Sequence, residues 1–232
     1  MPLDREAVAE LEQWGVHAFT TTRAAGSFST DSCEPVRDVM ARWLALREEL
    51  AALGPRLATA RQVHGNRVLT HGGGWEGWLR VDGADGHVAS ERGTALAVSI
   101  ADCVPVFIAH PSGVIALLHS GWKGTAGRIV EVGIAELARL GLAARELRVH
   151  LGPSICGSCY EVSADVYGTL TGRSVVRNTC VDLRALIAEH ARRAGVREIT
   201  TSSWCTRCDN DRFFSHRAGD EGRQLAVVIA ER

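Results

Sequence analysis

The sequence predicts a mixed α+β fold of short buried strands and amphipathic helices. Two β-branched apolar runs, at residues 104–109 and 114–118, are separated by His-Pro-Ser-Gly, the pattern of two buried strands joined by a tight turn. An apolar-periodic run over residues 129–140 is typical of a helix. The chain has 232 residues, of which 46% are hydrophobic, enough to bury a full core. We therefore expect residues 1–232 to form a single domain.

The part of the chain before this hairpin alternates between helical and strand patterns. We expect a short helix over residues 4–14, a strand over 16–21, a helix over 35–53 and a strand over 57–63. Pro35 near its start and Gly54-Pro55 at its end bound the second helix. The glycine-rich residues 71–75 are predicted to form a loop.

The part of the chain after the hairpin repeats this alternation. Beyond the helix at residues 129–140, the pattern predicts a strand at 147–151, a helix at 181–194, and strands at 196–200 and 224–230. The sequence has no repeat, low-complexity tract or clear linker. This continuity supports the prediction of one domain.

Charge and composition argue against several classes of protein. The formal net charge is −1 and there is no run of basic residues, so neither nucleic acid nor a membrane surface is expected as a partner. No stretch reaches the ~18 apolar residues of a membrane span, and the acidic N-terminal segment lacks the apolar region of a secretion signal. We expect a cytoplasmic protein, either a monomer or a homodimer.

The chain contains seven cysteines, an odd number. Without a secretion signal, reduced thiols that bind metal or react are a better interpretation than a disulfide framework. Two pairs, Cys156-x-x-Cys159 and Cys205-x-x-Cys208, have the spacing of zinc-binding cysteines.

The predicted hairpin brings two reactive side chains to one place. Cys103 opens the first strand and His119 closes the second, so antiparallel pairing makes a thiolate and an imidazole spatial neighbours. His64 is a third candidate, because it ends another predicted strand and Gly65 leaves room for its ring to point into a cleft.

Three arrangements of these groups are possible. His64, Cys103 and His119 suit a catalytic zinc ion, which commonly has three protein ligands and a water. Alternatively, Cys103 is a nucleophile, with His119 as its base and an aspartate as the orienting group. In the third arrangement, the two Cys-x-x-Cys pairs form a structural four-cysteine zinc site in a binding module. Spacing alone does not decide between the first two.

Residues that suit an anion such as phosphate surround these positions. After the second strand, Gly121 allows close approach of the backbone, a helix start offers unpaired N–H groups, and Lys123 adds positive charge. Arg23 lies in a polar turn that also suits an anion. Asp82 and Asp85, in Asp-Gly-Ala-Asp, fit either turn formation or acid–base work.

Several segments share their sequence and order with a known family. They are Gln62-Val63-His64-Gly65, Asp82-Gly83-Ala84-Asp85, Ala101-Asp102-Cys103-Val104-Pro105-Val106, His119-Ser120-Gly121-Trp122-Lys123-Gly124, Leu151-Gly152-Pro153 with Cys159-Tyr160-Glu161-Val162, and Cys205-Thr206-x-Cys208 with Phe213-Phe214-Ser215. From about Phe19 to the C-terminus, the chain resembles the purine nucleoside phosphorylase family of laccase-domain proteins, also called polyphenol oxidase or YfiH-type. The combination of segments is specific, although each piece is short.

The resemblance implies an α+β fold in which mixed β-sheets pack together and are flanked by helices, in α/β/β/α layers. It implies that His64, Cys103 and His119 are catalytic residues and ligands of zinc, with copper as the less favoured metal. Three carboxylates at the substrate site would act as acid–base groups or orient a histidine: Asp82, Asp85 and Asp102.

The resemblance also implies the reaction. Purine nucleosides, namely adenosine, inosine, guanosine and methylthioadenosine, would be cleaved by inorganic phosphate to the base and ribose 1-phosphate. Adenosine would in addition be deaminated, so that the enzyme is both a transferase and a hydrolase.

Phosphate, the co-substrate, would be held by Arg23, Lys123 and the backbone around Gly121. The sequence departs from the family's pattern here. Lys123 stands where the family usually has arginine, and lysine cannot form arginine's bidentate fork with phosphate. Ala25 replaces a usual glycine, and the segment at residues 28–42 has diverged.

Other functions remain open at this point. One is a Cys-His hydrolase that edits cell-wall precursors, a role also proposed in this family. A copper-dependent polyphenol oxidase is disfavoured, because multicopper sites need paired histidines and the nine histidines here are scattered. The third is a non-enzymatic zinc-binding module.

Overall fold

Continuous apolar runs in the central strands give the molecule two stacked β-sheets whose central strands are buried on both faces. The computed structural model describes residues 3–232. The first sheet contains, in spatial order, β1 (Arg5–Ala7), β2 (Val16–Thr21), β14 (Gln224–Ala230), β7 (Thr94–Ile100), β3 (Arg56–Arg61) and β5 (Gly77–Asp82). The second contains β13 (Glu198–Thr201), β10 (Arg148–Leu151), β8 (Val104–Ala109), β9 (Ile115–Ser120), β6 (Gly86–Ala89) and β4 (Val68–His71). Both sheets mix parallel and antiparallel pairs.

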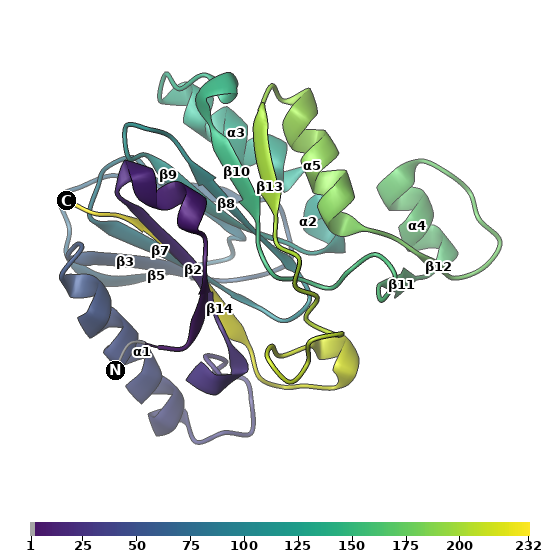
Figure 1. Cartoon of the computed structure of the whole chain (residues 1–232), viewed down its shortest axis with the longest axis horizontal. Helices are drawn as coiled ribbons and strands as arrows, with labels where there is room; N and C mark the ends of the chain where they lie inside the picture. Colours follow the sequence, from purple (N-terminus) through teal and green to yellow (C-terminus); the bar gives the residue numbers. More distant parts are fainter. Residues whose placement is uncertain (1–2) are drawn as a thin grey trace.

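Helices cover the outer face of each sheet, as Figure 1 shows. α1 (Val36–Ala51) lies on the first sheet, and α3 (Ile129–Arg139) and α5 (Leu183–Arg193) lie on the second. The short α2 (Trp122–Ala126) follows β9, and α4 (Ala164–Thr171) lies beside a small sheet of β11 (Glu161–Val162) and β12 (Thr179–Cys180). The described residues also contain four 3₁₀ helices: η1 (Ala9–Trp14), η2 (Arg23–Ala25), η3 (Ala144–Glu146) and η4 (His216–Ala218). No helix within residues 3–232 is long and apolar enough to cross a membrane.

Three buried clusters correspond to the three contacts between layers. Successive strand residues point to opposite faces, so Leu117 of β9 packs between the sheets while Leu118 packs against the helices. The cluster between the sheets also contains Leu96, Phe107 and Val228, and the cluster under α1 contains Phe19, Leu46 and Val227. The expected α/β/β/α arrangement of mixed sheets is confirmed.

The predicted elements are mostly found at or near their expected bounds. The central hairpin forms β8 and β9, and the strands predicted at 16–21 and 224–230 are β2 and β14. The helices predicted at 35–53, 129–140 and 181–194 are α1, α3 and α5. The central strand predicted to close at His119 extends to Ser120, which places His119 inside β9.

Other predictions are wrong in ways that tertiary contacts explain. The helix expected over residues 4–14 is split into β1 and η1, because Arg5–Ala7 pairs with β2. The strand expected at 57–63 ends at Arg61, and His71, expected in a loop, ends β4 by pairing with Ala89 of β6. The strands β5, β6 and β7 were not predicted: β6 has only four residues, β5 carries Arg80 and Asp82, and β7 is a longer apolar run that pairs with β14 and β3.

A buried histidine pair lies in the second sheet. His71 Nε2 and His87 Nδ1 are 2.9 Å apart, and His87 has no exposed surface. Burial lowers the pKa of the His87 imidazole to about 3 and also lowers the pKa of His71. Both rings therefore favour the neutral form in the folded protein.

We expect the stability of the protein to fall in acid because of this pair. Unfolded His87 has a pKa of about 6.5, so between pH 6.5 and about 3 the unfolded chain binds more protons than the folded one. The free energy of unfolding should then decrease by up to about 1.4 kcal/mol per pH unit as the pH falls. Urea denaturation at several pH values measures this slope, which should be shallower in His87→Gln. An equal slope in His87→Gln and wild type would contradict the prediction.

Candidate active site

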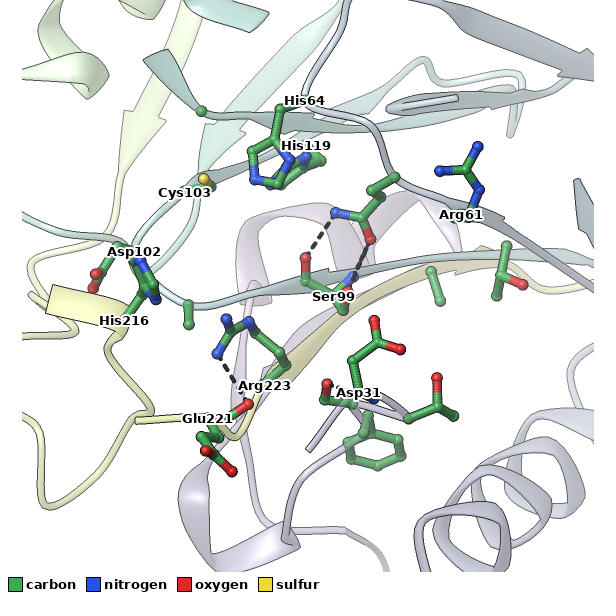
Figure 2. A pocket seen from close by; sticks show the side chains of 18 of the residues that line it. Asp31, Arg61, His64, Ser99, Asp102, Cys103, His119, His216, Glu221 and Arg223 are labelled. Carbon is green, nitrogen blue, oxygen red and sulfur yellow. Dashed lines mark hydrogen bonds between the residues drawn. The ribbon is translucent and has the colours of Figure 1, made fainter. Parts of the chain in front are cut away.

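The central hairpin places Cys103 beside His119. The register of β8 and β9 pairs Val104 with Ser120 and Pro105 with His119, so Cys103, one residue before β8, lies next to the end of β9. His64 reaches the same place from the turn after β3, and its ring centroid is 4.8 Å from that of His119. One donor atom from each of these three residues lies within 4.8 Å of the other two. Figure 2 shows the group on one wall of a cavity.

The carboxylate of Asp85 fixes the positions of both histidines. Asp85 is fully buried at the start of β6, where its Oδ1 lies 2.9 Å from His119 Nδ1. Three successive backbone N–H groups also donate to this carboxylate, those of Val63, His64 and Gly65, at 3.2, 2.9 and 2.8 Å. A run of N–H groups around one anion is a strong binding arrangement for the backbone. Asp85 thus links the turn that carries His64 to the strand that carries His119.

The backbone of His64 has an uncommon conformation that this carboxylate stabilises. Its φ of 58° lies in the left-handed region, which costs a residue other than glycine roughly 1–3 kcal/mol. The hydrogen bonds from residues 63–65 to a buried charge offset that cost. The conformation turns the His64 ring toward His119 and Cys103.

The electrostatics of the site favour a thiolate. Burial would raise the pKa of the Cys103 thiol, but the neighbouring His119 and His64 lower it to about 6. Burial would lower the pKa of His119, but the Cys103 thiolate and Asp85 raise it to about 9. Burial would likewise raise the pKa of Asp85, and its hydrogen bonds from His119 and the backbone hold it below its ordinary value. The thiolate can therefore act as a sulfur nucleophile, or it can bind a cation that displaces the second proton of the His119 ring.

These three side chains fit a zinc ion. Two imidazole nitrogens and one thiolate sulfur are common ligands of zinc, and a fourth position left to water is typical of catalytic sites. The hydrogen bond from His119 Nδ1 to Asp85 leaves Nε2 as the nitrogen available to a metal. Gly121 provides the space, because a Cβ at this position would lie 2.8 Å from Cys103 Sγ and 3.4 Å from His64 Cδ2.

The donor group opens into a cavity of about 1150 Å³. Aromatic side chains and cationic side chains line it together, from both sheets and from the C-terminal loop. They include Trp78, Trp122 and Tyr160, and Arg61, Arg80 and Arg223. Gln62 and Ser99 also line the cavity, joined by a hydrogen bond of 2.8 Å from Ser99 N to Gln62 Oε1. A cavity of this kind suits a ligand with both an aromatic and an anionic part.

Asp102 positions Cys103. Its φ of 82° is left-handed, and its Oδ1 and Oδ2 accept hydrogen bonds from Thr206 Oγ1 at 2.6 Å and from Arg217 N at 2.7 Å. Because the C-terminal loop already engages both oxygens, the geometry favours a positioning role for this carboxylate over proton transfer.

Three other predicted site residues have partners away from the donor group. Arg23 donates to Asn210 O and to Asp220, and Lys123 Nζ lies 5.6 Å from the centre of the Trp122 ring. Asp82 forms an exposed ion pair with Arg61 at 2.5 Å and ends β5 of the first sheet, whereas Asp85 precedes β6 of the second. Within residues 3–232, the side chains that line the cavity do not include these three, so their proposed roles in binding stay predictions.

The C-terminal loop and the first sheet add residues to the site that the sequence did not predict. Thr206 and Arg217 hold Asp102, and Arg80 and Arg223 line the cavity. Isolated arginines and threonines carry no spacing signal. Only the fold brings them to the hairpin.

Comparison with known proteins identifies the family. Residues 17–231 match the family described as multi-copper polyphenol oxidoreductase laccase. The chain belongs to this family. The relatives of this laccase-domain protein include an adenosine deaminase, RL5, from an unknown prokaryotic organism, which is 34% identical over 88% of this chain and 88% of its own length. A purine nucleoside phosphorylase of Deinococcus radiodurans is 34% identical over 91% of this chain and 88% of its own.

Solved structures of the laccase-domain family have the same fold. YlmD from Geobacillus stearothermophilus superposes with a TM-score of 0.84 and 28% identity, covering 94% of this chain and 93% of that one. YfiH from Bacillus licheniformis gives a TM-score of 0.88 at 23% identity, covering 99% and 97%. At the family level, the relatives' names support an enzyme that processes nucleosides.

Gly121→Ala should disturb the donor group while leaving the fold intact. The backbone of Gly121, with φ −81° and ψ −174°, suits alanine, but the new Cβ would displace Cys103 Sγ, the end of a short side chain. We expect thermal stability near that of the wild type. Metal affinity should fall at least about tenfold, as it does when a residue that supports a metal ligand is lost. Metal titration and thermal unfolding measure the two quantities. The control is Gly72→Ala, whose Cβ would have its nearest neighbour at 3.9 Å. Equal metal affinity in Gly121→Ala and Gly72→Ala would contradict the prediction.

Proposed function

We propose that this protein is a zinc-dependent purine nucleoside phosphorylase that also deaminates adenosine. The observation that carries the proposal is the group of His64, Cys103 and His119 at the wall of a cavity with aromatic and cationic side chains. The names of relatives at 34% identity supply the reaction class. The substrates are adenosine, inosine, guanosine or methylthioadenosine, with inorganic phosphate as the co-substrate of cleavage.

In this proposal, His64, Cys103 and His119 hold the zinc. When bound, zinc supplies Lewis-acid chemistry and lowers the pKa of a bound water toward 7. Asp85 holds His119 in one tautomer through Nδ1, and its hydrogen bonds from residues 63–65 keep His64 in place. Gly121 keeps the space beside Cys103 Sγ open.

The cavity accounts for both parts of the substrate. A purine has two faces that stack on aromatic rings, and Trp78, Trp122 and Tyr160 are available in the lining. Phosphate requires cationic donors, which Arg61, Arg80 and Arg223 supply on the same cavity. Arginine's planar fork suits phosphate better than the lysine at position 123 does.

The composition of the chain supports a proposal for its domain organisation, location and partners. We propose one laccase domain over residues 1–232 that acts in the cytoplasm as a monomer or homodimer. The net charge of −1 supports a small-molecule partner rather than a nucleic acid or a membrane.

A second candidate function is a Cys-His hydrolase acting on an amide. The observation that favours it is the order Asp85, His119, Cys103, in which a carboxylate orients an imidazole beside a thiolate. A multicopper oxidase is disfavoured, because within residues 3–232 the groups of possible metal ligands are one with two histidines and one with four cysteines.

The three proposed ligands should be required together for metal and activity. We expect about one zinc per chain at this site, lost in His64→Ala, Cys103→Ala and His119→Ala. Turnover of adenosine with phosphate should fall more than about 100-fold in each variant, because loss of an outer-shell partner alone costs 10–100-fold. Metal analysis, ribose 1-phosphate release, and inosine formation without phosphate are measured on the same samples.

His17→Ala serves as the control, since His17 is a half-exposed histidine paired with Glu231. A zinc content in all three ligand variants equal to that of the wild type would refute the ligand set. A chelated protein that keeps this nucleoside turnover, and loses it in Cys103→Ala, would replace the zinc with Cys103 as a nucleophile.

A further inference from the structure

The structure brings the two Cys-x-x-Cys pairs together at one end of the second sheet. β10 and β13 are parallel neighbours, so the loops that follow them leave the sheet at the same edge. Cys156 and Cys159 lie in the first loop, and Cys205 and Cys208 lie in the second. An isolated parallel bridge between Ser154 and Cys205 continues the contact beyond the strands. The four sulfurs consequently lie within 4.8 Å of one another.

We propose that Cys156, Cys159, Cys205 and Cys208 form a second metal site, a structural zinc site separate from the one at His64, Cys103 and His119. Tetrahedral zinc with bonds of about 2.3 Å places its four sulfurs about 3.8 Å apart. Here the Sγ atoms of Cys159 and Cys208 are 3.4 Å apart, and all four sulfurs lie within the 4.8 Å limit. Small shifts of flexible side chains would complete the tetrahedron.

The backbone around the cysteines is arranged for thiolates. Cys205 Sγ accepts hydrogen bonds from Cys156 N at 3.3 Å and from Cys208 N at 3.4 Å. Each donor belongs to one of the two pairs, so the buried Cys205 joins both loops. N–H groups directed at sulfur stabilise the charge that metal ligation requires. Arg207 adds a cationic side chain, held by a hydrogen bond of 3.1 Å from Nη1 to Cys159 O.

The convergence of four sulfurs favours a metal over a disulfide. A disulfide between Cys159 and Cys208 would use two of the four sulfurs and leave the other two without a role. All four cysteines are free thiols in the structure. Two Cys-x-x-Cys pairs from separate loops are the ligand pattern of structural zinc sites.

This site supports the catalytic hairpin. Thr206, between the two cysteines of the second pair, donates its hydroxyl to Asp102 at 2.6 Å, and its N–H donates to Ser154 O at 3.2 Å. Ile155 N, next to Cys156, donates to Asp102 O at 3.0 Å. A metal that joins the two loops would therefore hold Asp102, and through it Cys103, in position. The four-cysteine site acts as a structural clamp behind the active site.

A background that lacks the first site isolates the second. In His64→Ala/Cys103→Ala protein, purified under reducing conditions, we expect about one zinc per chain by mass spectrometry of the metal. Adding Cys159→Ser and Cys208→Ser should lower this zinc to near zero. These two cysteines are less buried than Cys205, so their replacement disturbs packing less. Cys33→Ser, which changes an exposed cysteine outside the group, should leave the zinc unchanged.

If the cysteine variants fail to fold, a second measurement on the wild-type chain still tests the proposal. Cobalt substitution should give the intense thiolate-to-metal absorption of a four-sulfur site, and chelation should lower the unfolding temperature until zinc is restored. Background protein without zinc, or with its zinc unchanged by Cys159→Ser/Cys208→Ser, would overturn the proposal. A disulfide between Cys159 and Cys208 that persists in protein purified with a reductant would also overturn the proposal. The zinc count in this background does not depend on nucleoside turnover, so either proposal can fail alone.

Discussion

The buried carboxylate of Asp85 is the interaction on which the functional end of the molecule depends. It accepts hydrogen bonds from the backbone of residues 63–65 and from the His119 ring, and its own N–H and C=O are bonded to Arg67 and His119. A buried charge is stable only when such donors surround it. Asp85 thus makes the turn after β3, the start of β6 and the end of β9 one unit.

The layered core determines where that unit lies. Between the sheets the packing is apolar, with residues such as Phe107 and Leu117 fully buried. His119 occupies the same face of β9 as Leu117, two residues further along, where the apolar core gives way to the cavity. A rigid sheet therefore presents a reactive side chain at its end, and the left-handed residues His64 and Asp102 turn their neighbours toward it.

The C-terminal third of the chain completes the site from behind. Its loops hold Asp102 through Thr206 and Arg217, and they bring the two cysteine pairs together. The Cys103 thiolate and the four-cysteine group are thus connected through a few hydrogen bonds. In this arrangement the position of Cys103 in the hairpin depends on the structure of the loops that carry the cysteine pairs.

The elements with strong local patterns, and the contacts between residues close in sequence, could be predicted from the amino-acid sequence. The apolar runs of β8 and β9 and the helical period of α1, α3 and α5 are local signals, and the hairpin register makes Cys103 and His119 neighbours. The tertiary contacts separate Asp82 and Asp85, three residues apart: Asp82 ends β5 of the first sheet in a surface ion pair, and Asp85 precedes β6 of the second sheet at the buried centre of the site. They also split the predicted N-terminal helix through pairing with β2, and they brought arginines from several elements to one cavity. Such contacts join residues that are far apart in the chain, so the pattern within a short stretch of sequence does not predict them.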